Sequence, residues 1–364
     1  MRVQTADTNK RKKSFLRFRK SLFANSNFID NDFFMIKKLF DGSAVFLREN
    51  EAIGLYVEDD ESGILCEGII AYSKKLPEYV MLCFFQSLPG KIEAVRLLVD
   101  SVSQYGRSKN CKKIAVGING HLNYGLGLLS SDYESTNSFS SPANSQFVND
   151  CFRELCFDEV LLNTYVIDTV DDRLDRYQKL HRRISARYTF RTFNRKDFDG
   201  DVKLFTDLNN TIFVDHKFYY PRTYEEDYEM IKELFLFVKE DSLYFIYDRD
   251  KPIGFFLWYP DFNELAHPGD RFGAGQYIRS VFHKKYRTAK FIAFGLLEEY
   301  RKKGIPISIA CIFQENFLRY GVTRIESSWI LADNADSNNV AGTICDRTYK
   351  KYTVYEKDLY AADT

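Results

Sequence analysis

A basic turn lies where an expected strand gives way to an expected helix. The strand covers residues 289–297, the turn covers residues 301–304, and the amphipathic helix begins at Ile305. A helix N-terminus offers main-chain N–H groups without partners and the positive end of the helix dipole. The turn is therefore predicted to bind an anion such as a diphosphate, with its lysines adding charge.

An aromatic segment with one histidine follows the first helix of the second half. It covers residues 215–220 and includes His216, Tyr219 and Tyr220. These side chains could line a pocket, or they could form a helix–helix corner with a histidine at the surface. No histidine has a spacing to a carboxylate or cysteine that indicates a metal site, so no metal is expected.

The elements that must position these residues can be read from the periodicity of apolar residues. In the first half we expect strands at 64–72, 79–86, 113–116 and 159–168, helices at 91–105 and 147–155, and a long loop at 119–145. In the second half we expect helices at 201–215, 224–236 and 336–345, a long helix that begins at 305, and strands at 242–247, 252–259, 289–297, 324–331 and 351–358.

Both halves follow the same order of strands and helices, β-β-(β)-α-β-α-β, which predicts an internal structural repeat. The expected domains are residues 1–170 and 197–364, joined by a charged helix and a strand at 171–196. The fold class is α/β (α+β), with two domains, which agrees with the length of 364 residues.

Composition excludes several classes of protein. Lys plus Arg and Asp plus Glu are 51 each, which argues against a sequence-independent nucleic-acid binder. No apolar run approaches the roughly 18 residues that span a bilayer, so no membrane partner is expected. The seven cysteines contain no C-x-x-C pair, which favours reduced thiols and a cytoplasmic location.

The N-terminus is strongly basic. Its eight basic residues face a single acid, Asp7, and they are Arg2, Lys10, Arg11, Lys12, Lys13, Arg17, Arg19 and Lys20. We interpret this segment as a solvated tail that leads into the first element, and the alternative is a patch for an anionic partner.

The turn also carries a resemblance to a known family. Residues 301–306, RKKGIP, resemble the (Arg/Gln)-x-x-Gly-x-(Gly/Ala) pyrophosphate loop of GNAT-type acyl-CoA transferases, although Pro306 lacks one N–H donor. Further segments fall in the same order at ordinary spacing: WYPDFN (258–263), GLLEEYRKKGI (295–305), ESSWIL (326–331) and YKKYTVYEK (349–357). The chain resembles bacterial tandem GNAT proteins, clearly over 240–358 and faintly before 170.

The resemblance implies two GNAT-like domains, each a mixed, largely antiparallel sheet with a central splay flanked by helices. In the second domain it implies an acetyl-CoA or other acyl-CoA site formed by Leu296, Leu297, Arg301, Lys302, Lys303, Gly304 and Asn334. The first domain has SLPG (87–90) at the equivalent place, so we expect no CoA there.

The remaining roles concern acyl transfer to an amine, which needs a base for the amine. Glu326 and Asp333, at the two ends of the strand 324–331, are the candidates, although an ion pair with Arg324 is the more ordinary role for Glu326. Tyr349 is the nearest phenol that could protonate the departing thiolate. For the substrate pocket we expect His216, Tyr219, Tyr220, Asn263 and Trp329.

The expected function is acyl-CoA-dependent N-acyl transfer, with acetyl transfer to an amine of a small molecule or amino acid derivative as its form. Two alternatives stay open: transfer from aminoacyl-tRNA, and a non-catalytic GNAT-fold binding protein. The partner would be a small-molecule amine, nucleic acid would enter only as tRNA, and the protein would be a monomer or homodimer.

Overall fold

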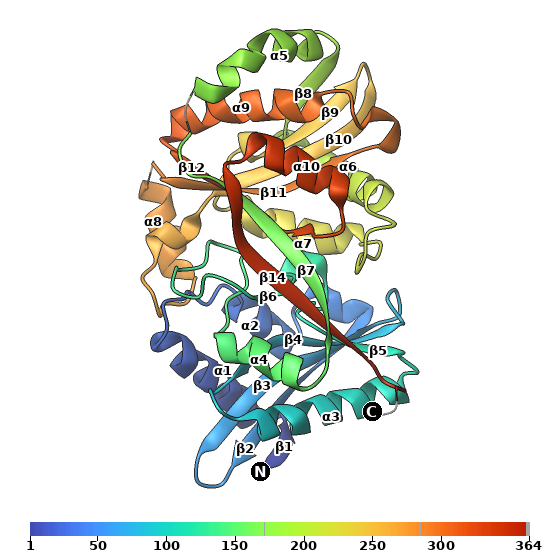
Figure 1. Cartoon of the computed structure of the whole chain (residues 1–364), viewed down its shortest axis with the longest axis vertical. Helices are drawn as coiled ribbons and strands as arrows, with labels where there is room; N and C mark the ends of the chain where they lie inside the picture. Colours follow the sequence, from blue (N-terminus) through green and yellow to red (C-terminus); the bar gives the residue numbers. More distant parts are fainter. Residues whose placement is uncertain (171, 284, 362–364) are drawn as a thin grey trace. The chain divides into compact units, whose positions relative to one another are not determined.

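The computed structural model describes residues 1–170, 172–283 and 285–361, and these form two compact units (Figure 1). Unit 1 contains Met1–Leu162, Ala266–Ala274 and Lys350–Thr364, and unit 2 contains Asn163–Leu265 and Gly275–Tyr349. The chain therefore changes unit within two strands, which differs from the expected boundary near residue 170. Residue 171 of the expected connector, and residues 284 and 362–364 of the expected second domain, lie outside the described residues.

Unit 1 is built on a mixed sheet. Its strands are β1 (Arg2–Thr5), β2 (Asn50–Asp59), β3 (Gly63–Ser73), β4 (Tyr79–Ser87), β5 (Lys113–Val116), β6 (Leu128–Leu129) and the second part of β14 (Arg347–Asp358). Its helices are α1 (Asn9–Ala24), α2 (Phe33–Asp41), α3 (Ile92–Ser108) and α4 (Gln146–Glu154), with short 3-10 turns at Val45–Arg48 and Leu122–Tyr124. The order is β1-β2-β3-β4-β5-β14, antiparallel except for the parallel pair β4 and β5.

Unit 2 repeats this arrangement. Its strands are β8 (Tyr188–Thr192), β9 (Leu243–Asp248), β10 (Lys251–Pro260), β11 (Thr288–Leu296), β12 (Arg324–Ser327), β13 (Ile330–Leu331) and the second part of β7 (Asp158–Ile167). Its helices are α5 (Gln178–Ser185), α6 (Phe198–Ile212), α7 (Tyr224–Leu234), α8 (Ala274–Phe282), α9 (Ile305–Tyr320) and α10 (Ala335–Ile344). The order is β8-β9-β10-β11-β12-β7, and only β11 and β12 are parallel.

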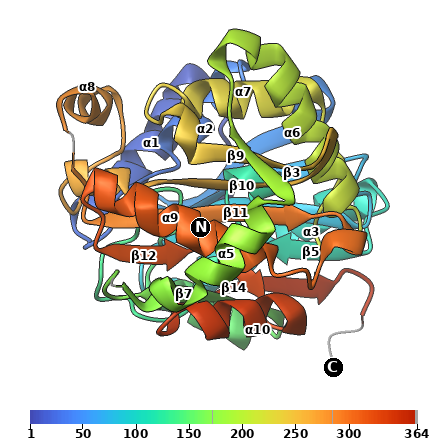
Figure 2. The ribbon, with the colours of Figure 1, turned by 90° about the horizontal axis from the view of Figure 1, so that it is seen from above.

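The two faces of β10 hold different helices of unit 2. Phe255 packs edge-on against Phe205 of α6, with ring centroids 5.0 Å apart. Its neighbour Phe256 packs edge-on against Phe313 of α9, at 5.1 Å. Because successive strand residues point to opposite faces, α6 and α9 cover opposite sides of the sheet. Figure 2 shows α5 beside α9.

The repeat predicted from the sequence is confirmed by the topology. Each unit has an antiparallel meander, β2-β3-β4 or β9-β10-β11, followed by a helix, α3 or α9, and a parallel strand, β5 or β12. The expected mixed α/β class is therefore correct. Among the described residues, no helix is long and apolar enough to cross a membrane.

The basic N-terminus is not a solvated tail. It forms β1 and α1, and Thr8 caps α1 by accepting a hydrogen bond from the Arg11 N–H. Phe15, Arg19 and Phe23 are spaced four apart, lie on one face of α1, and are all buried. The interpretation of Arg19 as a solvated residue is therefore wrong.

Arg19 is the centre of a buried charge cluster in unit 1. Its guanidinium donates to the Asp30 carboxylate at 3.0 Å, to Asp32 Oδ2 at 2.8 Å and to the Phe84 carbonyl at 3.0 Å. Burial raises the pKa of Asp32 to about 6, although Arg19 opposes this shift. Burial also raises the pKa of Glu67 well above its usual range. Arg19 therefore joins α1 to β4 through the hydrogen bond to Phe84, and its ion pairs hold Asp30 and Asp32 beside α1.

Candidate functional site

Strands β11 and β12 separate partway along unit 2. They pair in parallel only from Thr288 with Arg324 to Phe291 with Ser327, and the Ser328 N–H then donates to the Phe291 carbonyl at 2.6 Å. Beyond this point β11 continues to Leu296, whereas β12 has ended. The predicted strand 324–331 is accordingly interrupted, because Ser328 and Trp329 leave the sheet before β13 begins.

A β-bulge accompanies this separation. The register of β10 with β11 changes from Leu257 opposite Ala293 to Trp258 opposite Phe291, so Ile292 is an extra residue. A bulge bends its strand and increases the local twist. The bend therefore provides a physical reason for β11 to diverge from β12 at this position.

The main chain at the end of β11 faces the resulting gap. The Leu297 N–H donates to the Ile253 carbonyl of β10 at 2.9 Å, and the Leu297 carbonyl accepts from the Tyr300 N–H at 2.9 Å. Since main-chain groups alternate in direction along a strand, those of Leu296 point away from β10, toward the gap. The N–H of Leu297 is already paired, and the expectation that Leu296 and Leu297 contact the donor through their main chain stays a prediction.

The basic turn follows this strand after the 3-10 turn Glu298–Tyr300. The Arg301 N–H donates to the Glu298 carbonyl at 3.1 Å. Within the part of the chain that the structure describes, the main-chain N–H groups of Lys302, Lys303 and Gly304 have no hydrogen-bond partner. These three amides precede the first turn of α9, where the helix dipole is positive. The sequence predicted an anion-binding turn at these residues; the amide of Arg301 is already paired, and anion binding by the other three stays a prediction.

Glycine is favoured at position 304 by its backbone conformation, and a Cβ there would meet only the end of one flexible side chain. Gly304 has φ +77°, in the left-handed region, and a side chain there would meet the Ile184 Cδ1 of α5 at 3.1 Å from its Cβ. Lys302 also has a left-handed φ of +63°. Pro306 lies in the first helical turn, and α9 continues for 16 residues after Gly304.

The lysines of the turn have weak partners. The Lys302 Nζ lies 3.7 Å from the Asp336 Oδ2 of α10, and both side chains are more than three-quarters exposed. The Lys303 Nζ lies 4.6 Å from the centre of the Tyr300 ring. Exposed ion pairs of this kind contribute little stability, so both cations remain available to an anionic ligand.

Asn334 is positioned near this turn but has a structural task. Its side chain caps α10 by accepting a hydrogen bond from the Ser337 N–H at 3.1 Å. Because Asp336 of the same helix pairs with Lys302, the N-terminus of α10 lies beside the basic turn. The prediction that Asn334 contacts CoA stays a prediction.

Two of the predicted substrate residues meet at the point of strand separation. The His216 ring packs against the Trp329 ring, with centroids 5.6 Å apart. Trp329 directly follows Ser328, which makes the last contact with β11. On the other side, the Ile212 side chain of α6 lies against Gly295, since a Cβ there would be 3.0 Å from Ile212 Cγ2. The segment 213–220 therefore forms a wall beside the gap.

The protonation of His216 is defined by its surroundings. Its Nδ1 lies 3.0 Å from the Lys217 carbonyl, which only accepts hydrogen bonds, so Nδ1 carries the proton. In the neutral ring, Nε2 then has the free lone pair. Burial lowers the pKa of His216 below its usual value of 6.5, and the nearby Asp333 opposes this shift. Neutral His216 can therefore accept a proton at Nε2.

An asparagine that the sequence reasoning missed holds this wall in place. Asn210 Oδ1 accepts from the Tyr219 hydroxyl at 2.5 Å and from the Arg222 N–H at 2.9 Å. Its amide also donates to the Arg222 carbonyl at 2.9 Å. Tyr219 and Tyr220 are themselves buried. The signal for Asn210 in the sequence is weak. It lies near the end of an amphipathic helix, shortly before the aromatic segment that begins at residue 215.

Three further predicted residues also lie in unit 2. Glu326 accepts from the Arg324 Nε at 3.2 Å, which is the ion pair that the sequence offered as its ordinary role. The Tyr349 ring lies 4.8 Å from the Arg324 guanidinium carbon, at the end of β12 that is roughly 10 Å from the separation point. Asn263 is buried in the 3-10 turn Phe262–Leu265. The structure does not bring Tyr349 or Asn263 to the gap, whereas Glu326 lies opposite Lys290, one residue before the last pair of β11 and β12.

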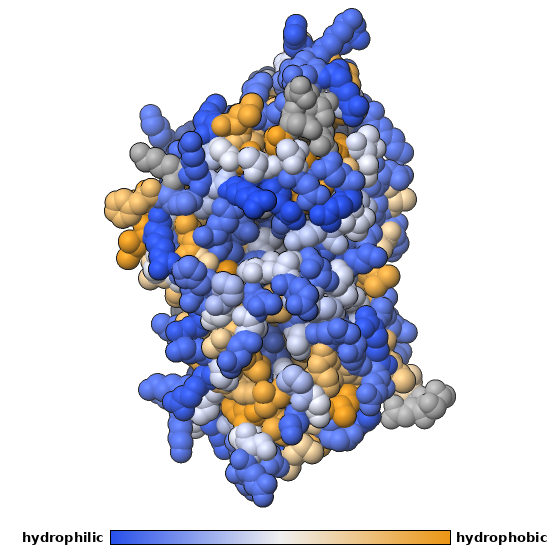
Figure 3. Space-filling model, turned by 60° about the vertical axis from the view of Figure 1, so that its left-hand side comes forward, coloured by the Kyte–Doolittle hydropathy of each residue, from blue (hydrophilic) through white to orange (hydrophobic). Residues whose placement is uncertain are grey.

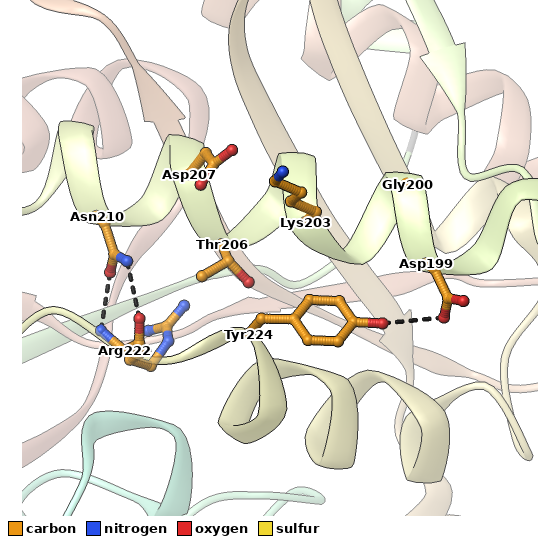
Figure 4. Close-up of a pocket in the computed structure, with 8 residues that line it drawn as sticks. All are labelled: Asp199, Gly200, Lys203, Thr206, Asp207, Asn210, Arg222 and Tyr224. Atoms are coloured by element: carbon orange, nitrogen blue, oxygen red, sulfur yellow. Dashed lines mark hydrogen bonds between the residues drawn. The ribbon is translucent and has the colours of Figure 1, made fainter.

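A separate hollow of about 510 Å³ lies between α6 and the start of α7 (Figure 4). Its lining residues are Asp199, Gly200, Lys203, Thr206, Asp207, Asn210, Arg222 and Tyr224. The Tyr224 hydroxyl donates to Asp199 at 2.9 Å across it. None of the predicted site residues lines this hollow, so it is distinct from the gap beside β11.

In unit 1 the equivalent gap is filled by the chain itself. β4 also carries a bulge, since Phe84 and Phe85 both oppose Gly68, and it pairs with β5 only as far as Leu82. The Phe84 N–H, which lies just past that point, donates to Asn119 Oδ1 at 2.8 Å. The Asn119 amide donates in turn to the Tyr124 carbonyl at 3.2 Å. A side chain thus occupies the place that is open in unit 2.

Replacing Asn119 by alanine is expected to lower the free energy of unfolding by about 1–3 kcal/mol, because the buried Phe84 N–H would lose its partner. Urea-induced unfolding followed by circular dichroism measures this change. Asn25→Ala is the matched control, since its amide is exposed and only bonds the Ser21 carbonyl. Equal stability of the two variants would show that Asn119 is not the residue that closes this gap.

Two curated proteins are similar in sequence to half of this chain. Protein YghO of Escherichia coli K12 is 26% identical over 190 residues, covering 50% of this chain and 49% of that protein. Bacterial ceramide synthase of Caulobacter vibrioides is 22% identical over 190 residues, covering 50% of each chain. The chain spans about half the length of these curated relatives. No protein-family model matches it.

A tandem GNAT protein from the clavulanic acid biosynthesis pathway, solved without acetyl-CoA, superimposes with a TM-score of 0.55 at 11% identity. The match covers 100% of both chains. The separated parallel strands, the bulge and the basic turn before α9 define a GNAT unit, and unit 1 repeats its topology. The chain therefore has the tandem GNAT fold that the sequence resemblance implied.

Proposed function

We propose that this protein transfers an acyl group from acyl-CoA to an amine, and that unit 2 carries the donor site. The observation that carries this proposal is the placement of the three amides without partners, from Lys302 to Gly304, directly after the open end of β11. The diphosphate would lie on these amides beside the two lysines. The pantetheine arm would pair with Leu296 as an additional strand along the gap.

The same chemistry disfavours donor binding in unit 1. There the amide after the last paired residue of β4 already donates to Asn119. The turn SLPG at 87–90 contains no cation, so it would not attract a diphosphate. A single acyl-CoA molecule per chain is the expected stoichiometry.

His216 would act as the general base for the acceptor. The amine nitrogen attacks the thioester carbonyl carbon, the carbon–sulfur bond breaks, and CoA leaves as a thiolate that takes a proton from solvent. Nε2 of His216 accepts the proton that the amine loses. Asp333 would stabilise the resulting imidazolium, since its charge already acts on the His216 ring. This assignment replaces Glu326 and Tyr349, which are held by Arg324.

The acceptor is proposed to be a long-chain amino alcohol. The similarity to a protein named bacterial ceramide synthase favours it, because a ceramide is the amide of such an amine with a fatty acid. The Trp329 ring beside His216 offers an apolar surface to an alkyl chain near the amine. Acetyl-CoA then becomes one of several acyl donors to be compared.

Reversing the two lysine charges, Lys302→Glu with Lys303→Glu, is expected to weaken acyl-CoA binding by at least about tenfold, since two charge-assisted contacts to phosphate would become repulsive. Isothermal titration calorimetry with acetyl-CoA and palmitoyl-CoA measures the dissociation constants.

Lys196→Glu with Lys203→Glu is the matched control, because both lysines are exposed in the same unit and the change in net charge is identical. The donor site would be wrongly placed if the two double variants lost the same affinity. Absence of acyl-CoA binding by the unaltered protein would remove the proposed function itself.

A further inference from the structure

Helix α8 presents an apolar face to solvent. Ile278, Val281 and Phe282 are 59%, 60% and 78% exposed, and Tyr277 is 37% exposed. Positions 277, 278, 281 and 282 are related by three- and four-residue steps, so they lie side by side on one face of the helix. An amphipathic helix at a protein surface ordinarily turns such residues inward. In α8 these apolar residues instead face the solvent.

The helix is nevertheless firmly attached to unit 2. Gln276 is buried, and the Tyr277 ring packs edge-on against Phe237 with centroids 5.3 Å apart. On the same helix, the Arg279 guanidinium donates to the Leu265 carbonyl at 2.7 Å. Ile278, Val281 and Phe282 are therefore held outward, with Tyr277 at the edge of their face in contact with unit 2.

Basic residues lie at the C-terminal end of this face, where the carboxylate of Glu264 accepts from the Arg287 and Thr288 N–H groups. The sequence from Ala274 to Arg287 contains no acidic residue, although the whole chain has 51 acidic and 51 basic side chains. Around the C-terminal end of α8, His283, Lys285 and Arg287 are exposed. Figure 3 shows orange, apolar side chains gathered at the left-hand edge with blue, hydrophilic ones around them.

We propose that α8 binds the surface of an anionic lipid bilayer. Its apolar side chains would enter the boundary between head groups and acyl chains, and the basic residues would contact anionic head groups. The positive charge at the C-terminal end of α8 selects this occupant over a second copy of the chain, whose α8 would bring the same charge. This proposal rests on the proposed function, because a long-chain amine acceptor partitions into membranes.

Surface binding is compatible with the absence of a spanning helix among the described residues. The expectation that the protein has no membrane partner came from the lack of a long apolar run. That criterion concerns segments that cross the bilayer. A helix that lies in the interface needs only one apolar face.

Vesicle flotation tests this surface directly. The full chain is expected to float with vesicles of phosphatidylcholine and phosphatidylglycerol, and to bind pure phosphatidylcholine vesicles more weakly. Ile278→Asn with Phe282→Asn should reduce binding to the anionic vesicles at least about tenfold, since two inserted apolar side chains are lost. Leu318→Asn is the matched control, because Leu318 is an apolar residue of α9 that is 71% exposed.

The outcomes separate this inference from the proposed function. Failure of the unaltered protein to float with anionic vesicles, or equal binding by the α8 variant, would overturn the membrane surface. A halved solution mass of the α8 variant in light scattering would also overturn it, by showing that α8 covers a second copy. Acyl-CoA titration of the same α8 variant should give an unchanged dissociation constant. If neither the unaltered protein nor the variants bound acyl-CoA, while the unaltered protein still floated with anionic vesicles, only the proposed function would be excluded.

Discussion

Replacing His216 by glutamine is expected to lower the maximal rate of acyl transfer at least about 100-fold, because the base that accepts the amine proton is removed. Glutamine keeps an N–H donor for the Lys217 carbonyl, so the segment 213–220 should keep its conformation. Donor affinity should be unchanged, since the basic turn is untouched. Continuous detection of the released CoA thiol measures the rate and the Michaelis constants.

The pH profile gives a second readout of the same residue. Because burial lowers the pKa of His216 below 6.5, the neutral form persists to a lower pH than for an exposed histidine. The rate of the unaltered protein should fall only as pH drops below 6.5, and His216→Gln should lose this acidic limb. His267→Gln serves as the control, since His267 is exposed and belongs to unit 1. An unchanged rate and profile in His216→Gln would exclude His216 as the base.

Replacing Arg19 by methionine is expected to lower the free energy of unfolding by about 3–5 kcal/mol at neutral pH, because the buried carboxylate of Asp30 and the partly buried carboxylate of Asp32 would lose their counter-charge. Both carboxylates and the Phe84 carbonyl bond the same guanidinium. Guanidinium chloride unfolding measures the loss. Arg17→Met is the matched control, since Arg17 is exposed on the same helix.

The sign of the pH dependence follows from the raised pKa of Asp32. An acid whose pKa is raised in the folded state favours folding at low pH, and this stability is lost as pH rises toward the folded pKa of about 6. Without Arg19 the folded pKa of Asp32 rises further. The deficit of Arg19→Met should therefore be larger at pH 8 than at pH 5. A deficit that is independent of pH would indicate lost packing alone.

Much of the fold was predictable because its signals are local. The long helix predicted to begin at Ile305 is α9, and its buried residues Ile305, Ile309 and Phe313 recur at helical spacing. The strand pairing of β14 could not be read in this way, since its partner β5 lies far away in the sequence. The burial of Arg19 was not predicted, because the basic composition of the N-terminus suggests a solvated segment. Its four-residue spacing from Phe15 and Phe23 was the signal for a buried helix face.

The candidate site was predictable to the extent that its residues are contiguous. The basic turn and the end of β11 follow one another in the sequence, and both lie where they were expected. The contact of His216 with Trp329 joins segments far apart in the sequence, and the tautomer of His216 depends on the carbonyl of Lys217. The ion pair between Glu326 and Arg324 was one of two roles that the sequence allowed for Glu326, and the structure shows it.

The return of the chain into unit 1 through β14 has a consequence for biosynthesis. Until the C-terminal residues leave the ribosome, β5 has no partner on the side where β14 pairs. At bacterial elongation rates, roughly 10 to 40 s separate the synthesis of β7 from that of β14. A nascent chain in this interval exposes a strand edge that can bind other polypeptides. Ribosomal stalling shortly before β14 would therefore leave the amino-terminal half of the protein dependent on chaperones.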